Sequence, residues 1–185
     1  MSKLAYLFFC FLVDTILSSI FTVDYANIRL SFVSNMGIVG LMFLCRNLNI
    51  KDTLLMAFVF GLFVDMTHYS FFSLMALSYT ITLFIVRIWS NQVNESIPEI
   101  LILGVLTIFV HNTIVFFIMR ILNISSITFI HWVSSRQFLT LIGNLPLILL
   151  AYFGYNIMMN LEIRKDNDRR KNEKTLWMKV SNPFE

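Results

Sequence analysis

Apolar runs long enough to cross a lipid bilayer follow one another along almost the whole chain. A transmembrane helix needs about 17 to 25 predominantly apolar residues to cross the ~30 Å hydrocarbon layer, and the polar breaks between these runs are short. Hydrophobic residues make up 57% of the 185 positions and charged residues only 14%. No stretch is left from which a separate soluble domain could be built. The sequence therefore predicts an all-α integral membrane protein.

Six membrane-spanning helices can be drawn, and together they predict a six-helix bundle. They cover about residues 4–23, 30–45, 53–66, 71–89, 97–122 and 138–159. The second and third are short for a full crossing, so we expect them to extend into their flanks, to tilt little or to be partly re-entrant. We interpret residues 1–160 as one transmembrane domain and residues 161–185 as a basic tail. The first run lacks a small-x-small cleavage site, which indicates a retained helix rather than a signal peptide.

The distribution of basic residues predicts the orientation. Positively charged loops resist translocation, so Lys and Arg collect on the cytoplasmic side. With the N-terminus inside, eleven of the fourteen basic residues are cytoplasmic, and only Arg29, Arg120 and Arg136 are outside. Both termini are therefore predicted to be cytoplasmic. The connection over residues 123–136 carries Trp132 and is expected to form a short interfacial helix on the outer side.

Two aspartates lie within the apolar runs, Asp14 in the first and Asp65 near the end of the third. Intramembrane carboxylates face the bundle interior or a water-filled cavity and need a partner or a proton. Paired carboxylates can also catalyse peptide hydrolysis. However, Gly-Leu-Phe-Val precedes Asp65 here, instead of the Gly-x-Gly of intramembrane aspartyl proteases. Thr-Ile follows Asp14, instead of the Asp-Arg pair of lipoprotein signal peptidases. The sequence favours a non-enzymatic role for both aspartates.

Ala57, Gly61 and Asp65 lie four residues apart, so a helix places them on one face. Small residues let two membrane helices approach closely, and a buried carboxylate can then accept a hydrogen bond across the contact. We expect the third helix to pack through this face, with helix packing or partner binding as the role of these residues and of Asp14. The candidate partners of Asp65 are Arg29, His68, Tyr69 and the polar residues of the fourth span.

Other residues indicate no metal or cofactor. The three histidines lack the spacing of metal ligands, and the two cysteines lie in apolar segments as small hydrophobes. Basic residues just inside a membrane attract anionic lipid, and a tryptophan among them can dip into the leaflet. The tail is thus either a lipid-binding segment or only a solvated topology signal, and nucleic-acid binding is not needed to explain it. The lipid-binding candidates are Arg164, Lys165, Arg169, Arg170, Lys171 and Trp177.

The block Phe60-Gly-Leu-Phe-Val-Asp65, together with Asp14 in the first span, resembles MreD, the rod-shape-determining membrane protein family of bacteria. In that family the glycine-leucine-x-x-aspartate block is followed by a short turn and an apolar span that ends near a basic residue, as residues 71–87 do here. Family members commonly have a glycine just after this turn, where the present sequence has Phe-Phe-Ser73. The resemblance covers roughly residues 4–160.

This resemblance implies a non-enzymatic scaffold in the bacterial cytoplasmic membrane. It implies binding to the bitopic protein MreC, and association with actin-like MreB and with the peptidoglycan synthases of the cell-elongation complex. MreD-like proteins are also similar in fold to the substrate-binding subunits of energy-coupling-factor transporters. A vitamin-binding transporter subunit is therefore the alternative function.

Overall fold

The computed structural model describes residues 3–21, 32–46, 48–68, 73–90, 93, 96–124 and 127–181. Side chains are described in these ranges as far as residue 171, except that of His68. Every regular element in this part of the chain is helical, which confirms the all-α class. The elements are α1 (Lys3–Ile20), α2 (Met36–Cys45), α3 (Ile50–His68), α4 (Leu74–Ser90), α5 (Ile97–Ile121), α6 (Phe129–Trp132), the π-helix η1 (Val133–Gln137) and α7 (Phe138–Ser181).

Three stretches of helix are long and apolar enough to cross a membrane, judged by length and composition. They are Lys3–Ile20, Ile97–Ile121 and Phe129–Lys171, and α2 and α4 are shorter apolar helices. Large apolar side chains are exposed on the outside of the bundle, among them Phe8, Ile102 and Phe153 at 59%, 67% and 54%. A water-soluble surface rarely exposes so many. These features support a membrane protein.

Helix α2 is the core of the bundle, because all ten of its residues are buried. Helices α1 and α7 pack against it, while α3, α4, α5 and α7 contact one another in sequence. At 1.5 Å per residue α2 is about 15 Å long, half of the hydrocarbon layer. Residues 32–35, which the sequence assigned to the same span, form a non-helical entry to it. Irregular backbone at this depth must find its hydrogen bonds within the protein.

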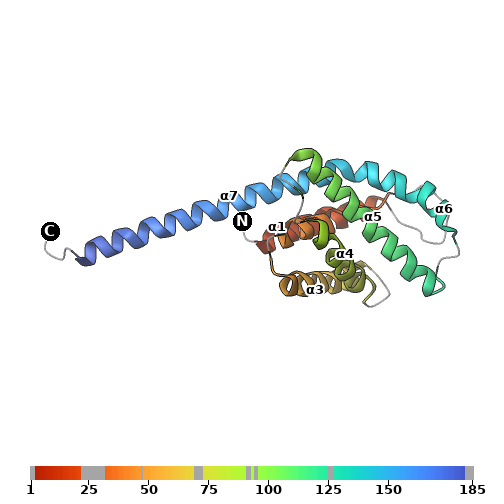
Figure 1. Ribbon diagram of the computed structural model, residues 1–185, viewed down its shortest axis with the longest axis horizontal. Coiled ribbons are helices and arrows are strands. Elements are labelled where there is room, and N and C mark those ends of the chain that lie inside the picture. Colours follow the sequence, from red (N-terminus) through yellow and green to blue (C-terminus); the bar gives the residue numbers. More distant parts are fainter. Residues whose placement is uncertain are drawn as a thin grey trace.

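The last helix is much longer than the predicted sixth span (Figure 1). The turns α6 and η1 lead directly into α7, so residues 129–137 begin this helix instead of forming a separate interfacial one. Trp132 is buried there, with its ring centroid 4.8 Å from that of Phe116 on α5. The 44 residues of α7 span about 66 Å. The tail therefore continues the same helix well beyond the bundle.

Candidate functional site

Asp65 forms hydrogen bonds to the first turn of α4. Its two carboxylate oxygens accept hydrogen bonds from the backbone amides of Met75 and Ala76, at 2.8 and 3.0 Å. These amides belong to the first turn of α4, where the N–H groups have no partner within the helix. The side chain is only 2% exposed, so no water replaces this carboxylate. A negative charge here is also favoured by the positive end of the helix dipole.

Gly61 brings the two helices close enough for this contact. A Cβ atom at position 61 would lie 2.7 Å from the backbone nitrogen of Ala76 and 2.8 Å from the carbonyl oxygen of Met75. No side chain fits between these backbones. Ala57, one turn earlier on the same face, is completely buried. The three small or acidic residues of this face therefore lie inside the chain, where Gly61 and Asp65 meet α4.

The turn before α4 has a second unusual feature. Ser73 has a φ of 79°, in the left-handed region where glycine is favoured and other residues are strained. Its carbonyl oxygen accepts the first hydrogen bond of the helix, from the amide of Leu77 at 3.1 Å. Ser73 is thus the residue at which the chain turns into α4, and the amides that follow it in the first turn bind Asp65.

Asp14 holds α2 in the same way. Its carboxylate accepts hydrogen bonds from the backbone amides of Met36 at 2.8 Å and Gly37 at 2.6 Å, and from the hydroxyl of Ser34. A Cβ at Gly37 would lie 2.7 Å from the Asp14 oxygen. Each carboxylate thus lies late in one helix and binds the N-terminus of the next. The two do not share a partner, as the oxygens of a catalytic aspartyl pair would.

Side chains from α7 form hydrogen bonds to the non-helical backbone that precedes α2. The Asn144 carboxamide accepts a hydrogen bond from the backbone amide of Asn35 at 3.0 Å and donates to the carbonyl of Val33 at 2.8 Å. The Thr140 hydroxyl accepts from the Val33 amide at 3.3 Å. These contacts satisfy the non-helical backbone before α2 and link it to a helix more than 100 positions away.

Arg87, at the end of α4, holds the other end of α2. Its guanidinium donates to the carbonyl oxygens of Cys45 at 2.5 Å and Arg46 at 3.1 Å, and to that of Leu48. The last carbonyls of a helix have no partner within it, and a cation is favoured there. Helix α2 therefore has an anion at its N-terminus and a cation at its C-terminus, both supplied by neighbouring helices.

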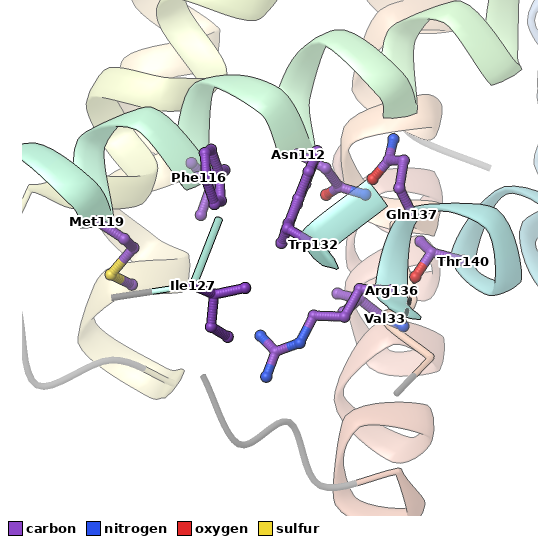
Figure 2. A pocket seen from close by; sticks show the side chains of 10 residues that line it. Val33, Asn112, Phe116, Met119, Ile127, Trp132, Arg136, Gln137 and Thr140 are labelled. Atoms are coloured by element: carbon purple, nitrogen blue, oxygen red, sulfur yellow. Dashed lines mark hydrogen bonds between the residues drawn. The ribbon is translucent and has the colours of Figure 1, made fainter. Parts of the chain in front are cut away.

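A small cavity with both apolar and polar lining residues lies where α7 begins (Figure 2). It measures about 40 Å³ and is lined by Asn112 of α5, by Trp132, by Arg136 and Gln137 of η1, and by Thr140. Arg136 and Gln137 are 4% and 2% exposed. Burying a charged group and an amide in an apolar bundle costs free energy unless each is paired or hydrogen-bonded.

The remaining candidates lie outside this bundle core. Arg164, Lys165, Arg169, Arg170 and Lys171 are exposed on α7, and the side chain of Trp177 lies outside the described part of the chain. Lys3 forms an ion pair with Glu162 at 4.0 Å, which places the start of α1 beside the point where the tail leaves the bundle. Arg29 and Tyr69, two of the partners predicted for Asp65, are likewise not described.

Sequence reasoning missed the roles of Arg87, Arg136, Gln137 and Asn144. The available signal was a polar side chain within or at the end of an apolar run, which applies to all four. It identifies a buried polar group but not the distant backbone or cavity it faces.

No family model, no functionally characterised protein and no solved structure matches this chain.

Proposed function

We propose that this chain is a non-enzymatic, six-span membrane scaffold of the bacterial cell-elongation complex, similar to MreD. It binds the single-pass protein MreC and links the MreB cytoskeleton to the enzymes of peptidoglycan synthesis. The complex would thereby keep lateral wall growth, and with it rod shape, under control of the cytoskeleton.

The geometry around Asp65 is the observation that carries this proposal. The MreD-like block combines a glycine, an aspartate four residues later and a glycine after the following turn. In the present structure Gly61 permits the close approach, Asp65 accepts two amide hydrogen bonds, and Ser73 has the backbone conformation of a glycine. Ser73, which stands where the family has a glycine, thus has a backbone conformation that glycine adopts readily. This supports the resemblance although the residue differs.

The chemistry of the two aspartates also supports a scaffold. Both carboxylates are engaged with backbone amides of this chain, which stiffens the bundle and leaves the outer helix faces apolar. In a bilayer, helices associate through packing and interhelical hydrogen bonds rather than through the hydrophobic effect. A rigid bundle with large exposed apolar side chains can thus present a fixed surface to a partner helix.

Six crossings with both termini in the cytoplasm agree with the positions of the charged residues. Arg87 contacts the carbonyl of Arg46, and Lys51 lies in the first turn of α3, so three basic residues gather near one end of α2. Val33 and Arg136 line one cavity, so α2 and the last helix begin near each other at the opposite end. We assign the first of these ends to the cytoplasm, by the positive-inside rule.

The basic tail is proposed to meet anionic lipid at the cytoplasmic surface. The exposed residues Arg164, Lys165, Arg169, Arg170 and Lys171 follow directly on the bundle, within reach of the headgroups. Each basic residue near an anionic surface contributes about 1 kcal/mol. The helix continues past this region to Ser181.

The vitamin-transporter alternative needs a site that is large enough for the vitamin and also carries placed polar groups. Pockets for small organic ligands measure about 300–1,000 Å³ and combine apolar walls with placed polar groups. The cavity lined by Arg136 and Gln137 has about 40 Å³. The larger hollows, of about 640 and 540 Å³, are apolar grooves beside α1. This favours the scaffold.

Purification in mild detergent, with MreC from the same organism co-expressed, tests the proposal. We expect MreC to be retained in stoichiometric amount and no vitamin to be found by mass spectrometry of the small molecules. Retention should fall in Asp65→Leu and persist in Asp52→Leu, because Asp52 is exposed in the first turn of α3. A vitamin retained in stoichiometric amount without MreC would instead establish the transporter subunit.

A further inference from the structure

An apolar groove lies on the outside of the bundle between α1 and α3. Both helices pack against α2, and the groove between them measures about 640 Å³. Leu7 and Met56 line it and pack against the core. Leu4, Leu55 and Val59 also line it, with 76%, 64% and 57% of their surface exposed. The groove is thus closed toward the core and open toward the outside, where a hydrophobic molecule would restore the van der Waals contacts that an empty hollow lacks.

Aromatic rings close the groove at one end. Phe11 is the last residue of α1 to line it, and its ring centroid lies 6.1 Å from that of Phe60 and 4.9 Å from that of Phe63 on α3. From Leu4 to Phe11 the helix rises about 10 Å. This is about two thirds of the ~15 Å that one leaflet contributes to the hydrocarbon layer. The groove therefore lies within one half of the bilayer.

Two lysines lie at the other end of the groove. Lys3 is one turn before Leu7, and Lys51 is one turn before Leu55, so each lysine shares a helix face with a lining residue. Both lysines are exposed. Helices α1 and α3 both begin at the end of the bundle where α7 continues into its tail (Figure 1). This is the end assigned above to the cytoplasm.

Two carboxylates accompany these lysines. A carboxylate oxygen of Glu162 lies 4.0 Å from the Lys3 ammonium, and the exposed Asp52 follows Lys51 in the first turn of α3. This end of the groove thus offers cations for a phosphate and anions for an amine. Phosphatidylethanolamine carries both a phosphate and a primary ammonium above its two acyl chains. The headgroup of phosphatidylglycerol has the phosphate but no cation for the carboxylates.

The length of the groove favours an acyl chain over a partner helix. A transmembrane helix is about 10–12 Å wide and crosses all of the ~30 Å hydrocarbon layer. Beyond the contact between Phe11 and Phe63, such a helix would lie outside the groove. An acyl chain is narrower and ends within its own leaflet.

We propose that the groove between α1 and α3 binds one molecule of phosphatidylethanolamine from the cytoplasmic leaflet. One acyl chain lies along the groove as far as Phe11, the phosphate meets Lys3 and Lys51, and the ammonium meets the neighbouring carboxylates. The choice of leaflet rests on the orientation proposed above, whereas the binding itself does not depend on the scaffold function.

Native mass spectrometry of the full chain, delipidated in a mild detergent, tests this proposal. The chain is titrated with phosphatidylethanolamine, phosphatidylglycerol or diacylglycerol of the same acyl chains, and the bound molecules are counted. Val59→Trp fills the groove with an indole, so the binding that this variant loses is the binding in the groove, and lipid held by the basic tail is not counted. We expect this component to be one phosphatidylethanolamine per chain, bound more tightly than either other lipid.

Four variants link the binding to the groove. Val59→Trp should weaken the first phosphatidylethanolamine at least about fivefold, because the acyl chain then overpacks the site. Lys51→Gln should weaken it about twofold to fivefold, as expected for an exposed ion pair, and Asp52→Asn should remove the preference over phosphatidylglycerol. Ile102→Trp, at a similarly exposed position on α5 that does not line the groove, is the control and should bind like the native chain.

Three results would overturn the proposal. They are undiminished phosphatidylethanolamine binding in Val59→Trp, an equal loss in Ile102→Trp, and a groove component that holds phosphatidylglycerol or diacylglycerol as tightly. If Val59→Trp kept the lipid but lost co-purifying MreC, the groove would instead belong to a partner helix.

Discussion

Asp14 and Asp65 do for membrane helices what a serine or asparagine cap does for a helix in water. The first amides of a helix need acceptors, and within a bilayer no water supplies them. In this chain the acceptor comes from the preceding helix: Asp14 binds the amides of Met36 and Gly37, and Asp65 those of Met75 and Ala76. A carboxylate whose exposure to lipid would cost free energy thereby joins two consecutive helices.

Ser73 allows a stabilising substitution at the same contact. Its φ of 79° is strained for any residue with a Cβ, by about 1–2 kcal/mol. Ser73→Gly should therefore raise the free energy of unfolding by about 1 kcal/mol, measured by thermal unfolding in detergent. The same change at Ser78, a buried helical position whose hydroxyl donates to Met75, should destabilise. If both changes destabilised alike, Ser73 would not be under strain.

At the scale of elements, the bundle depends on close approach between helix pairs and on buried helix ends. Gly61 sits against the backbone of α4, and Arg87 covers the last carbonyls of α2. Both features act on backbone atoms of a neighbouring helix.

Gly61→Ala should separate α3 from α4 and weaken the Asp65 contact. The added Cβ would lie 2.7 Å from the Ala76 nitrogen, and forced overpacking costs about 1–3 kcal/mol. The unfolding temperature should fall. Gly154→Ala on α7 is the matched control, because its nearest neighbour is a Tyr6 ring carbon at 3.3 Å and alanine favours the helix. An equal loss in both variants would contradict the close contact at Gly61.

Arg87→Met should loosen the end of α2 while preserving an apolar stem. The carbonyls of Cys45 and Arg46 would lose their donor, and the buried Cys45 thiol would react faster with a maleimide. The measurement uses a Cys10→Ala background, so that only Cys45 is labelled. Lys51→Met, which removes an exposed charge near the same end, should leave the rate unchanged. Unaltered labelling in Arg87→Met would show that the guanidinium does not hold this end.

At the scale of the whole molecule, the helix pairs α1–α2 and α3–α4 are each joined by a carboxylate bound to backbone amides. Helix α5 packs against α4 and α2, and α7 packs against α2 and α1. The all-α class follows from composition and from apolar runs, which are local properties of the sequence. So does the common face of Ala57, Gly61 and Asp65. The partners of the two aspartates do not follow, because a backbone amide carries no sequence signal. Likewise, Arg87 counts in the sequence only as one of the cytoplasmic basic residues, and Gln137 lies between the predicted connection 123–136 and the predicted span 138–159.

The topology makes a prediction for intact cells. With both termini in the cytoplasm, His131→Cys on α6 should react with a membrane-impermeant maleimide added to intact spheroplasts. Arg169→Cys on the exposed part of α7 should react only after permeabilisation. Both variants use a background that lacks Cys10 and Cys45. Labelling of Arg169→Cys from outside would reverse the proposed orientation.

Amide hydrogen exchange in Asp14→Leu and Asp65→Leu tests most directly whether each carboxylate holds the next helix. Asp65→Leu should lose protection in the first turn of α4, residues 74–77, and retain it at residues 36–39. Asp14→Leu should show the reverse, and α5 should stay protected in both. Unchanged exchange at these two helix starts, or the same loss at both in either variant, would contradict the account.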